Sequence, residues 1–222
     1  DTSQPHSNVV FPHMFAWLDE VLETIRRHPE TLFVLRAHPD EHRAGKESRE
    51  SVAAWAEQNE ITALPNVVFY DSAQFVSSYQ LIQRSKFVMI YNSTIGLEAA
   101  ILGMPVLCAG RARFTQLPTV FFPQSSAAYL QQLEAFLAVG DFSVPPEFQI
   151  NARRFLYYQL FRSSLPFGEF LEDERLWPGF VRLRCFGWEQ LTPAHSPAMQ
   201  VLVDELKKLE ITQPVFSFLL PE

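Results

Sequence analysis

The 222-residue sequence has few of the residues that several common classes of protein require. Its two cysteines, Cys108 and Cys185, lie far apart and without metal-ligand spacing, so neither a disulfide framework nor a zinc site is expected. We expect two reduced, mostly buried thiols in a cytoplasmic protein. Lys and Arg number 18 against 25 acidic residues and form no block. Nucleic-acid binding through a basic face is therefore disfavoured.

Long apolar runs and the common catalytic motifs are also lacking. The apolar runs, such as residues 87–91 and 101–109, are far too short to span a bilayer, and no secretory signal is visible. The sequence has no P-loop, no GxGxxG, no HExxH and no GxSxG. ATP hydrolysis, dinucleotide binding, zinc proteolysis and α/β-hydrolase chemistry lose their support. Because the chain starts at Asp1 and its first methionine is Met14, we expect a processed product or a fragment.

Short apolar segments alternate with segments of helical periodicity in the first 140 residues. The apolar runs predict strands over residues 31–37, 67–70, 86–91 and 105–109, with a last short strand over 119–122. Helices are predicted over residues 11–27, 46–59, 75–84, 94–102 and 125–139. Nearly all-apolar strands separated by helices are typical of a parallel sheet covered on both faces. We expect an α/β fold with a Rossmann-like, doubly wound sheet.

The pattern changes after residue 140. A Val144-Pro145-Pro146 break precedes a strongly aromatic predicted helix over residues 148–162. An irregular aromatic stretch follows over residues 167–191, and a terminal helix over 198–209. We therefore divide the chain into a Rossmann-like domain over residues 1–140 and a mostly helical extension over residues 141–222. The extension is expected to pack on that domain or on a partner domain.

The stretch from Tyr91 to Val106, YNSTIGLEAAILGMPV, is the most informative part of the sequence. It predicts a strand, a polar turn, a helix and a second strand. A helix start with hydroxyls at Ser93 and Thr94 suits a phosphate, because it presents free N–H groups and a positive dipole end. Glu98, one turn later, can accept hydrogen bonds from a ribose. Asn92 is a further cap or base contact, and Gly96 allows close approach of a ligand or a strand.

A second polar element, Arg36-Ala37-His38-Pro39, follows the first predicted strand. Pro39 holds His38 in an extended conformation and directs its imidazole into the crevice above the sheet. A nearby phosphate would keep this ring protonated, since its ordinary pKa is near ~6.5. A surface loop histidine is about as good an interpretation. His28-Pro29, by contrast, is expected to end a helix.

Together these two elements resemble capsule polysaccharide biosynthesis proteins of bacteria, over residues 31–110. The resemblance implies the carboxyl-terminal half of a GT-B glycosyltransferase, related to Kdo transferases and bacterial polysialyltransferases. In those relatives a His-Pro and a Ser-Ser or Ser-Thr motif hold the phosphate of a cytidine nucleotide donor, which implies this role for His38, Ser93 and Thr94. Arg36 belongs to the same motif, and the Glu-Ala segment implies a ribose contact for Glu98.

The resemblance implies a metal-independent transferase that takes a nucleotide-sugar donor, CMP- or CDP-linked by preference and UDP-linked as the second choice. The saccharide acceptor would bind a missing amino-terminal domain, so this part alone is expected to be inactive and no catalytic base is assigned. Peripheral association of the full-length protein with the inner face of the membrane is a further expectation.

Two other functions remain open from the sequence. One is a sugar-nucleotide epimerase of GT-B architecture, although Asn92-Ser93-Thr94-Ile95-Gly96 and the single Glu98 fit its Asp-Ser-Gly-Gly and Glu-Glu-Ala pattern poorly. The other is a non-enzymatic Rossmann-like interaction module, which the aromatic tail would favour.

Overall fold

The computed structural model describes residues 5–42, 50–140, 143–176 and 179–209. The chain divides into two compact units, Asp1–Arg153 and Arg154–Glu222, and each is described by itself. The functional division expected after residue 140 stays a prediction.

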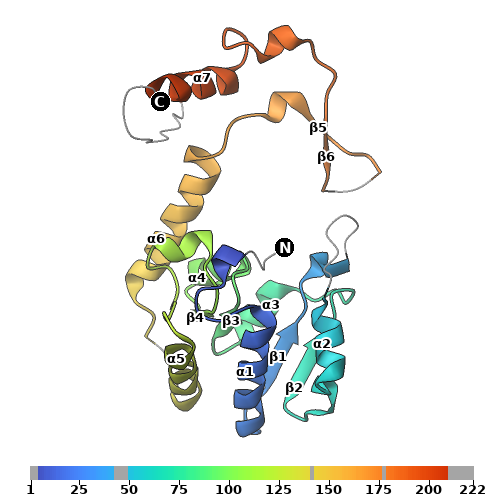
Figure 1. Cartoon of the computed structure of the whole chain (residues 1–222), viewed down its shortest axis with the longest axis vertical. Coiled ribbons are helices and arrows are strands. Elements are labelled where there is room, and N and C mark those ends of the chain that lie inside the picture. The colour runs from blue at the N-terminus through green and yellow to red at the C-terminus, as the bar shows by residue number, and fades with distance from the viewer. Residues whose placement is uncertain (1–4, 43–49, 141–142, 177–178, 210–222) are drawn as a thin grey trace. The chain divides into compact units, whose positions relative to one another are not determined.

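Four short parallel strands form the centre of the first unit. Strand β1 (Phe33–Arg36) pairs with β2 (Val67–Tyr70), and β3 (Val88–Ile90) pairs with β4 (Val106–Cys108). Figure 1 shows β1 and β2 beside helices α1 and α2. A single parallel bridge joins Leu107 to Phe121, where a last short strand was predicted.

The strand predictions hold in position but not in the way the strands join. The strand over residues 67–70 is confirmed at both ends, and the others are shorter than predicted. Among the described residues of the first unit, the four strands form two separate parallel pairs, with no ladder between β1 and β3. The mixed α/β fold is therefore confirmed, whereas one continuous, doubly wound Rossmann-like sheet is not. Apolar runs locate strands, but lateral pairing depends on contacts between distant residues.

Around these strands the described residues form the α-helices α1 (Met14–Arg27), α2 (Val52–Gln58), α3 (Ser78–Arg84), α4 (Ile95–Ile101) and α5 (Ser126–Ala138). The start of the helix predicted over residues 46–59 lies partly outside the described residues. Side chains cap several helix starts: His13 accepts from the Ala16 N–H at 3.0 Å, and Ser125 accepts from the Ala128 N–H at 3.2 Å. Such caps satisfy amide donors that the helix itself leaves free.

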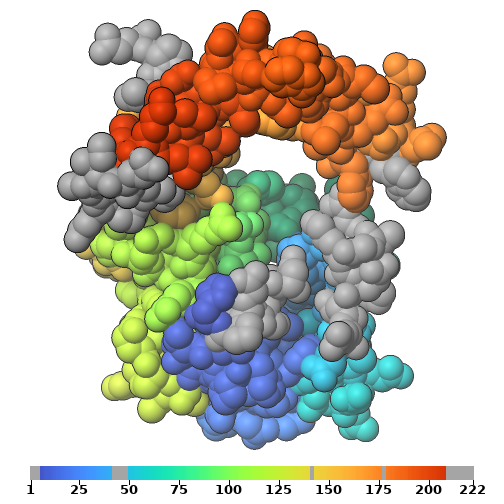
Figure 2. All heavy atoms as spheres, turned by 45° about the horizontal axis from the view of Figure 1, so that its top comes forward, coloured from blue at the N-terminus to red at the C-terminus, as the bar shows by residue number. Residues whose placement is uncertain are grey.

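One apolar core joins α1, α2 and α5 to both strand pairs. Trp17 and Leu22 of α1 and Tyr129 and Leu133 of α5 are buried in it together with Leu107 of β4. Helices α1 and α2, whose blue and cyan segments adjoin in Figure 2, are also joined by a part-buried 2.8 Å hydrogen bond from the Trp55 Nε1 to Asp19. Much of the dense aromatic content of the first unit thus serves the core.

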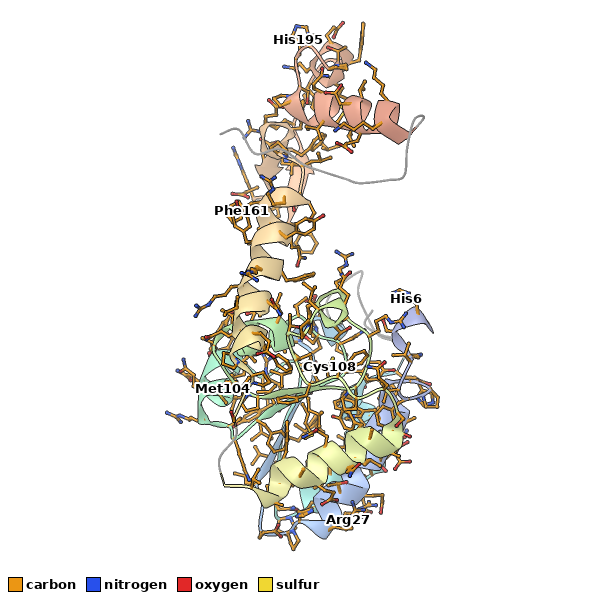
Figure 3. All side chains as sticks on the ribbon, turned by 90° about the vertical axis from the view of Figure 1, so that its left-hand side faces the viewer. His6, Arg27, Met104, Cys108, Phe161 and His195 are labelled. Atoms are coloured by element: carbon orange, nitrogen blue, oxygen red, sulfur yellow. The ribbon has the colours of Figure 1, made fainter. Side chains whose placement is uncertain are left out.

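The two thiols differ in environment. Cys108 is fully buried in the interior of the first unit (Figure 3), and burial raises the pKa of its thiol to about 12. Cys185 of the second unit is exposed. The expectation of mostly buried thiols therefore holds for Cys108 and is wrong for Cys185.

The second unit contains more regular structure than predicted. Helix α6 (Pro146–Tyr157) begins in the first unit and continues as a π-helix over Tyr158–Arg162. The stretch expected to be irregular contains an antiparallel hairpin of β5 (Leu171–Asp173) and β6 (Val181–Leu183). The terminal helix, α7, spans Pro197–Leu209. Spacing alone did not predict the hairpin, because its strands are only three residues long and carry charged side chains.

Candidate functional site

His38 lies just beyond the end of β1. Ala37 extends the pairing of this strand, since its N–H donates to the Tyr70 carbonyl at 2.9 Å. The His38 side chain is exposed, and its Nδ1 accepts a hydrogen bond of 3.1 Å from the Asp40 N–H. Because an amide can only donate, Nδ1 is an acceptor, and the neutral ring carries its proton on Nε2. His38 therefore presents an N–H donor rather than a lone pair to the solvent.

Arg36 is the last residue of β1. Its Nη1 donates to the Ser78 hydroxyl at 2.7 Å, which joins β1 to the start of α3. Its Nε is buried and makes no hydrogen bond to any of the residues that the structure describes. A half-buried guanidinium is suited to an anionic ligand, because it is cationic and carries several N–H donors.

The turn from Asn92 to Thr94 connects β3 to α4. Thr94 is the N-cap residue, yet its side chain makes no capping hydrogen bond. The Gly96 N–H instead donates to the Ser93 carbonyl at 3.1 Å, and the Leu97 N–H donates to the Thr94 carbonyl at 3.0 Å. Some of the first N–H groups of α4 therefore already donate hydrogen bonds within the chain. The helix is also short, with only seven residues. The half-buried Ser93 and the exposed Thr94 offer hydroxyls as the clearer ligand groups.

Gly96 allows α4 to pack closely on the strands. A Cβ atom at this position would lie 2.1 Å from the Ile90 Cδ1 of β3 and 3.4 Å from the Val106 Cγ1 of β4. Of the two interpretations given to this glycine, close approach to a strand has a direct structural basis. The glycine sets how closely α4 approaches β3, and so where the 92–94 turn lies.

Glu98 lies in the first turn of α4 and accepts a hydrogen bond from the hydroxyl of Tyr79 in α3. This hydrogen bond to a carboxylate raises the pKa of Tyr79, so the phenol stays protonated as a donor. Tyr79 is 51% exposed. No sequence motif surrounds Tyr79, and the packing of α3 on α4 brings it to Glu98.

Two adjacent residues thus connect the two predicted elements. Ser78 contacts Arg36 of the first element, and Tyr79 contacts Glu98 of the second. A cationic group and a carboxylate are thereby tied to the same turn of α3. His38 takes part in neither contact. Neither Ser78 nor Tyr79 was a candidate from the sequence.

A model of the family described as capsule polysaccharide biosynthesis protein matches residues 4–117, which is just over half of the chain. The chain belongs to this family. All seven predicted site residues, from Arg36 to Glu98, lie within the match. Neither the curated proteins nor the solved structures contain a significant match to the chain.

A metal site and a membrane-spanning helix each place specific requirements on the described residues. Among the residues that the structure describes, no group of three or more His, Cys, Asp and Glu could hold a metal ion. Within the same residues, no helix has both the length and the apolar character needed to cross a membrane.

His28-Pro29 has the structural role that was predicted for it. His28 caps the end of α1, and its N–H donates to the Ile25 carbonyl at 3.2 Å. Its carbonyl accepts from the Asn66 side chain at 2.9 Å. The two His-Pro elements therefore differ in use, since His28 holds structure together and His38 faces solvent.

Proposed function

We propose that this capsule polysaccharide biosynthesis protein provides the donor-binding part of a glycosyltransferase of GT-B type. Membership of the family supports a role in capsule synthesis. The observation that carries the finer proposal is the joining of Arg36 and Glu98 to adjacent residues of α3. A nucleotide sugar needs both groups, a cation for its phosphate and an acceptor for its ribose hydroxyls.

Each predicted residue has a role in this proposal. Arg36 and the Nε2–H of His38 donate to the phosphate, and the Ser93 and Thr94 hydroxyls add neutral donors. Glu98 accepts from the ribose. These groups stabilise the departing nucleotide by neutralising the charge that develops on it, an electrostatic role that needs no metal ion. Asn92 borders the same turn, and Gly96 holds α4 in place.

The donor proposed is a pyrimidine nucleotide sugar, CMP- or CDP-linked by preference, with UDP-linked donors as the second choice. The saccharide acceptor is proposed to bind an amino-terminal domain, which would also carry the catalytic base. This chain is therefore proposed to bind the donor without transferring sugar by itself. Peripheral membrane association is proposed only for the full-length protein.

Titration of the purified chain by calorimetry with CMP, CDP, UMP and UDP tests the proposal. At least one nucleotide is expected to bind, and His38→Ala is expected to weaken that binding. His195→Ala, in the second unit, is the matched histidine control and should leave affinity unchanged. Absence of binding to all four nucleotides at millimolar concentration would overturn the proposal for this chain.

A further inference from the structure

We infer that Tyr79 is a positioning residue that orients Glu98 for the ribose of the donor, an inference that rests on the proposed function. The relevant contact is the hydrogen bond from the Tyr79 hydroxyl to the Glu98 Oε2. It joins two helices, α3 and α4, and involves a residue that no sequence motif marks. The ligand class that it selects is a ribonucleotide, as opposed to a nucleotide without free ribose hydroxyls.

The chemistry of the carboxylate supports this role. A carboxylate has two oxygens and accepts about four hydrogen bonds. Tyr79 uses Oε2, which leaves Oε1 of Glu98 to accept from a ribose hydroxyl. A glutamate without a partner samples several rotamers and loses that freedom when a ligand binds. Because Tyr79 orders the side chain beforehand, part of this entropy cost is removed from binding.

Tyr79 is itself held in place from the other side of the site. Its neighbour Ser78 accepts the 2.7 Å hydrogen bond from Arg36 of β1, so the first turn of α3 is fixed to the strand. Tyr79 therefore does not simply follow Glu98 as that side chain moves. Its ring is half exposed, and removal of the hydroxyl leaves no cavity in the core.

The position of Tyr79 gives a specific dependence on ribose hydroxyls. Tyr79→Phe removes the hydrogen bond and retains the ring, so Glu98 loses its orientation while α3 keeps its packing. Affinity for CDP or UDP is expected to fall about 5-fold, the effect of one modest hydrogen bond. Affinity for the 2′,3′-dideoxy form of the same nucleotide is expected to stay the same, since that ligand offers no hydroxyl to Glu98.

A double-mutant cycle tests whether Tyr79 acts through Glu98. Calorimetric affinities for CDP and UDP and for their dideoxy forms are measured for the wild type, Tyr79→Phe, Glu98→Ala and the double variant. Tyr158→Phe, a half-exposed tyrosine of the second unit, is the control. In the Glu98→Ala background, Tyr79→Phe is expected to have no further effect. Circular dichroism and thermal melts verify that each variant is folded.

The outcomes separate this inference from the proposed function. Equal weakening of ribose and dideoxy ligands by Tyr79→Phe, no weakening of either, or additive effects of the two substitutions would overturn the role of Tyr79 alone. Absence of nucleotide binding by the wild type would overturn the proposed function and this inference with it. Selective loss of ribonucleotide affinity, abolished in the Glu98→Ala background, supports the inference.

Discussion

The Nε2 of His28 lies 2.8 Å from the Oε2 of Glu134, which joins the end of α1 to α5. The same carboxylate accepts from Arg27 at 2.6 Å, and the Nδ1 of His28 lies 2.9 Å from Glu30 (Figure 3 labels Arg27 at this end of α1). A neutral imidazole has one N–H and can donate to only one of these two carboxylates. The arrangement is therefore complete only when His28 is protonated.

The first prediction concerns the pH dependence of stability. Hydrogen bonds to Glu30 and then Glu134 raise the pKa of His28 in the folded chain. The contribution of His28 to the free energy of unfolding is fully present below its unfolded pKa near 6.5. It is lost as pH rises through the higher pKa of the folded chain. His28→Gln should therefore flatten the pH dependence of the free energy of unfolding above pH 6.5. We expect a contribution below about 1 kcal/mol, since solvent screens the exposed Glu30 and the partly exposed Glu134.

Glu134, the acidic partner of His28, contributes to stability with the opposite pH dependence. Arg27 first and His28 second lower the pKa of Glu134, so its contribution is present above the unfolded pKa near 4.5 and is lost as pH falls through the folded value. Urea denaturation between pH 3 and pH 9 measures both the loss of stability at low pH and the loss at high pH. A wild-type profile that stays flat between pH 6 and pH 9 would contradict the role given to His28.

The second prediction concerns Gly96. Gly96→Ala places a methyl group 2.1 Å from the Ile90 Cδ1, so α4 or the isoleucine must shift. Overpacking of this kind costs about 1 to 3 kcal/mol of unfolding free energy. Ile90→Val removes the atom in the way, so the double variant should regain part of the loss. Chemical denaturation of all four proteins measures the coupling, and strictly additive effects would show that the two side chains do not meet.

The part of the fold that the sequence predicts is the part that depends on neighbours along the chain. The 67–70 strand is an uninterrupted apolar run, and the helix start at Ser126 follows the capping serine Ser125, so both could be located from the sequence. The separation of β1 and β3 into different pairs could not, because hydrogen bonding between strands depends on residues that are distant in sequence.

The same distinction applies to the site. His38, Ser93, Thr94 and Glu98 follow or begin predicted elements, and an α/β pattern draws attention to such positions. Tyr79 lies in a helix with no motif, and its place beside Glu98 depends on the packing of α3 on α4. The role of Gly96 likewise required the position of the Ile90 side chain.

The third prediction concerns the charge of Arg36. Arg36→Gln removes the cation and, with a side chain two atoms shorter, also the contact with Ser78, so affinity for CDP should fall about 10-fold or more. Affinity for cytidine, which has no phosphate, should fall much less. Raising the salt concentration should weaken CDP binding to the wild type more than to the variant. Equal losses for CDP and cytidine would contradict a phosphate contact and indicate a general disturbance of the site.

The last prediction separates the two nitrogens of His38. Nδ1 accepts from the Asp40 N–H, and the proposed phosphate contact uses the Nε2–H. Asparagine can reproduce the acceptor close to the backbone, whereas the amide of glutamine reaches about as far as Nε2 and can donate. If Nε2 holds the phosphate, His38→Gln should retain more CDP affinity than His38→Asn, and His38→Asn should bind as weakly as His38→Ala. If the turn itself matters most, the order of Gln and Asn reverses. Calorimetry of the three variants with CDP therefore distinguishes a ligand contact from a loop contact at a single ring.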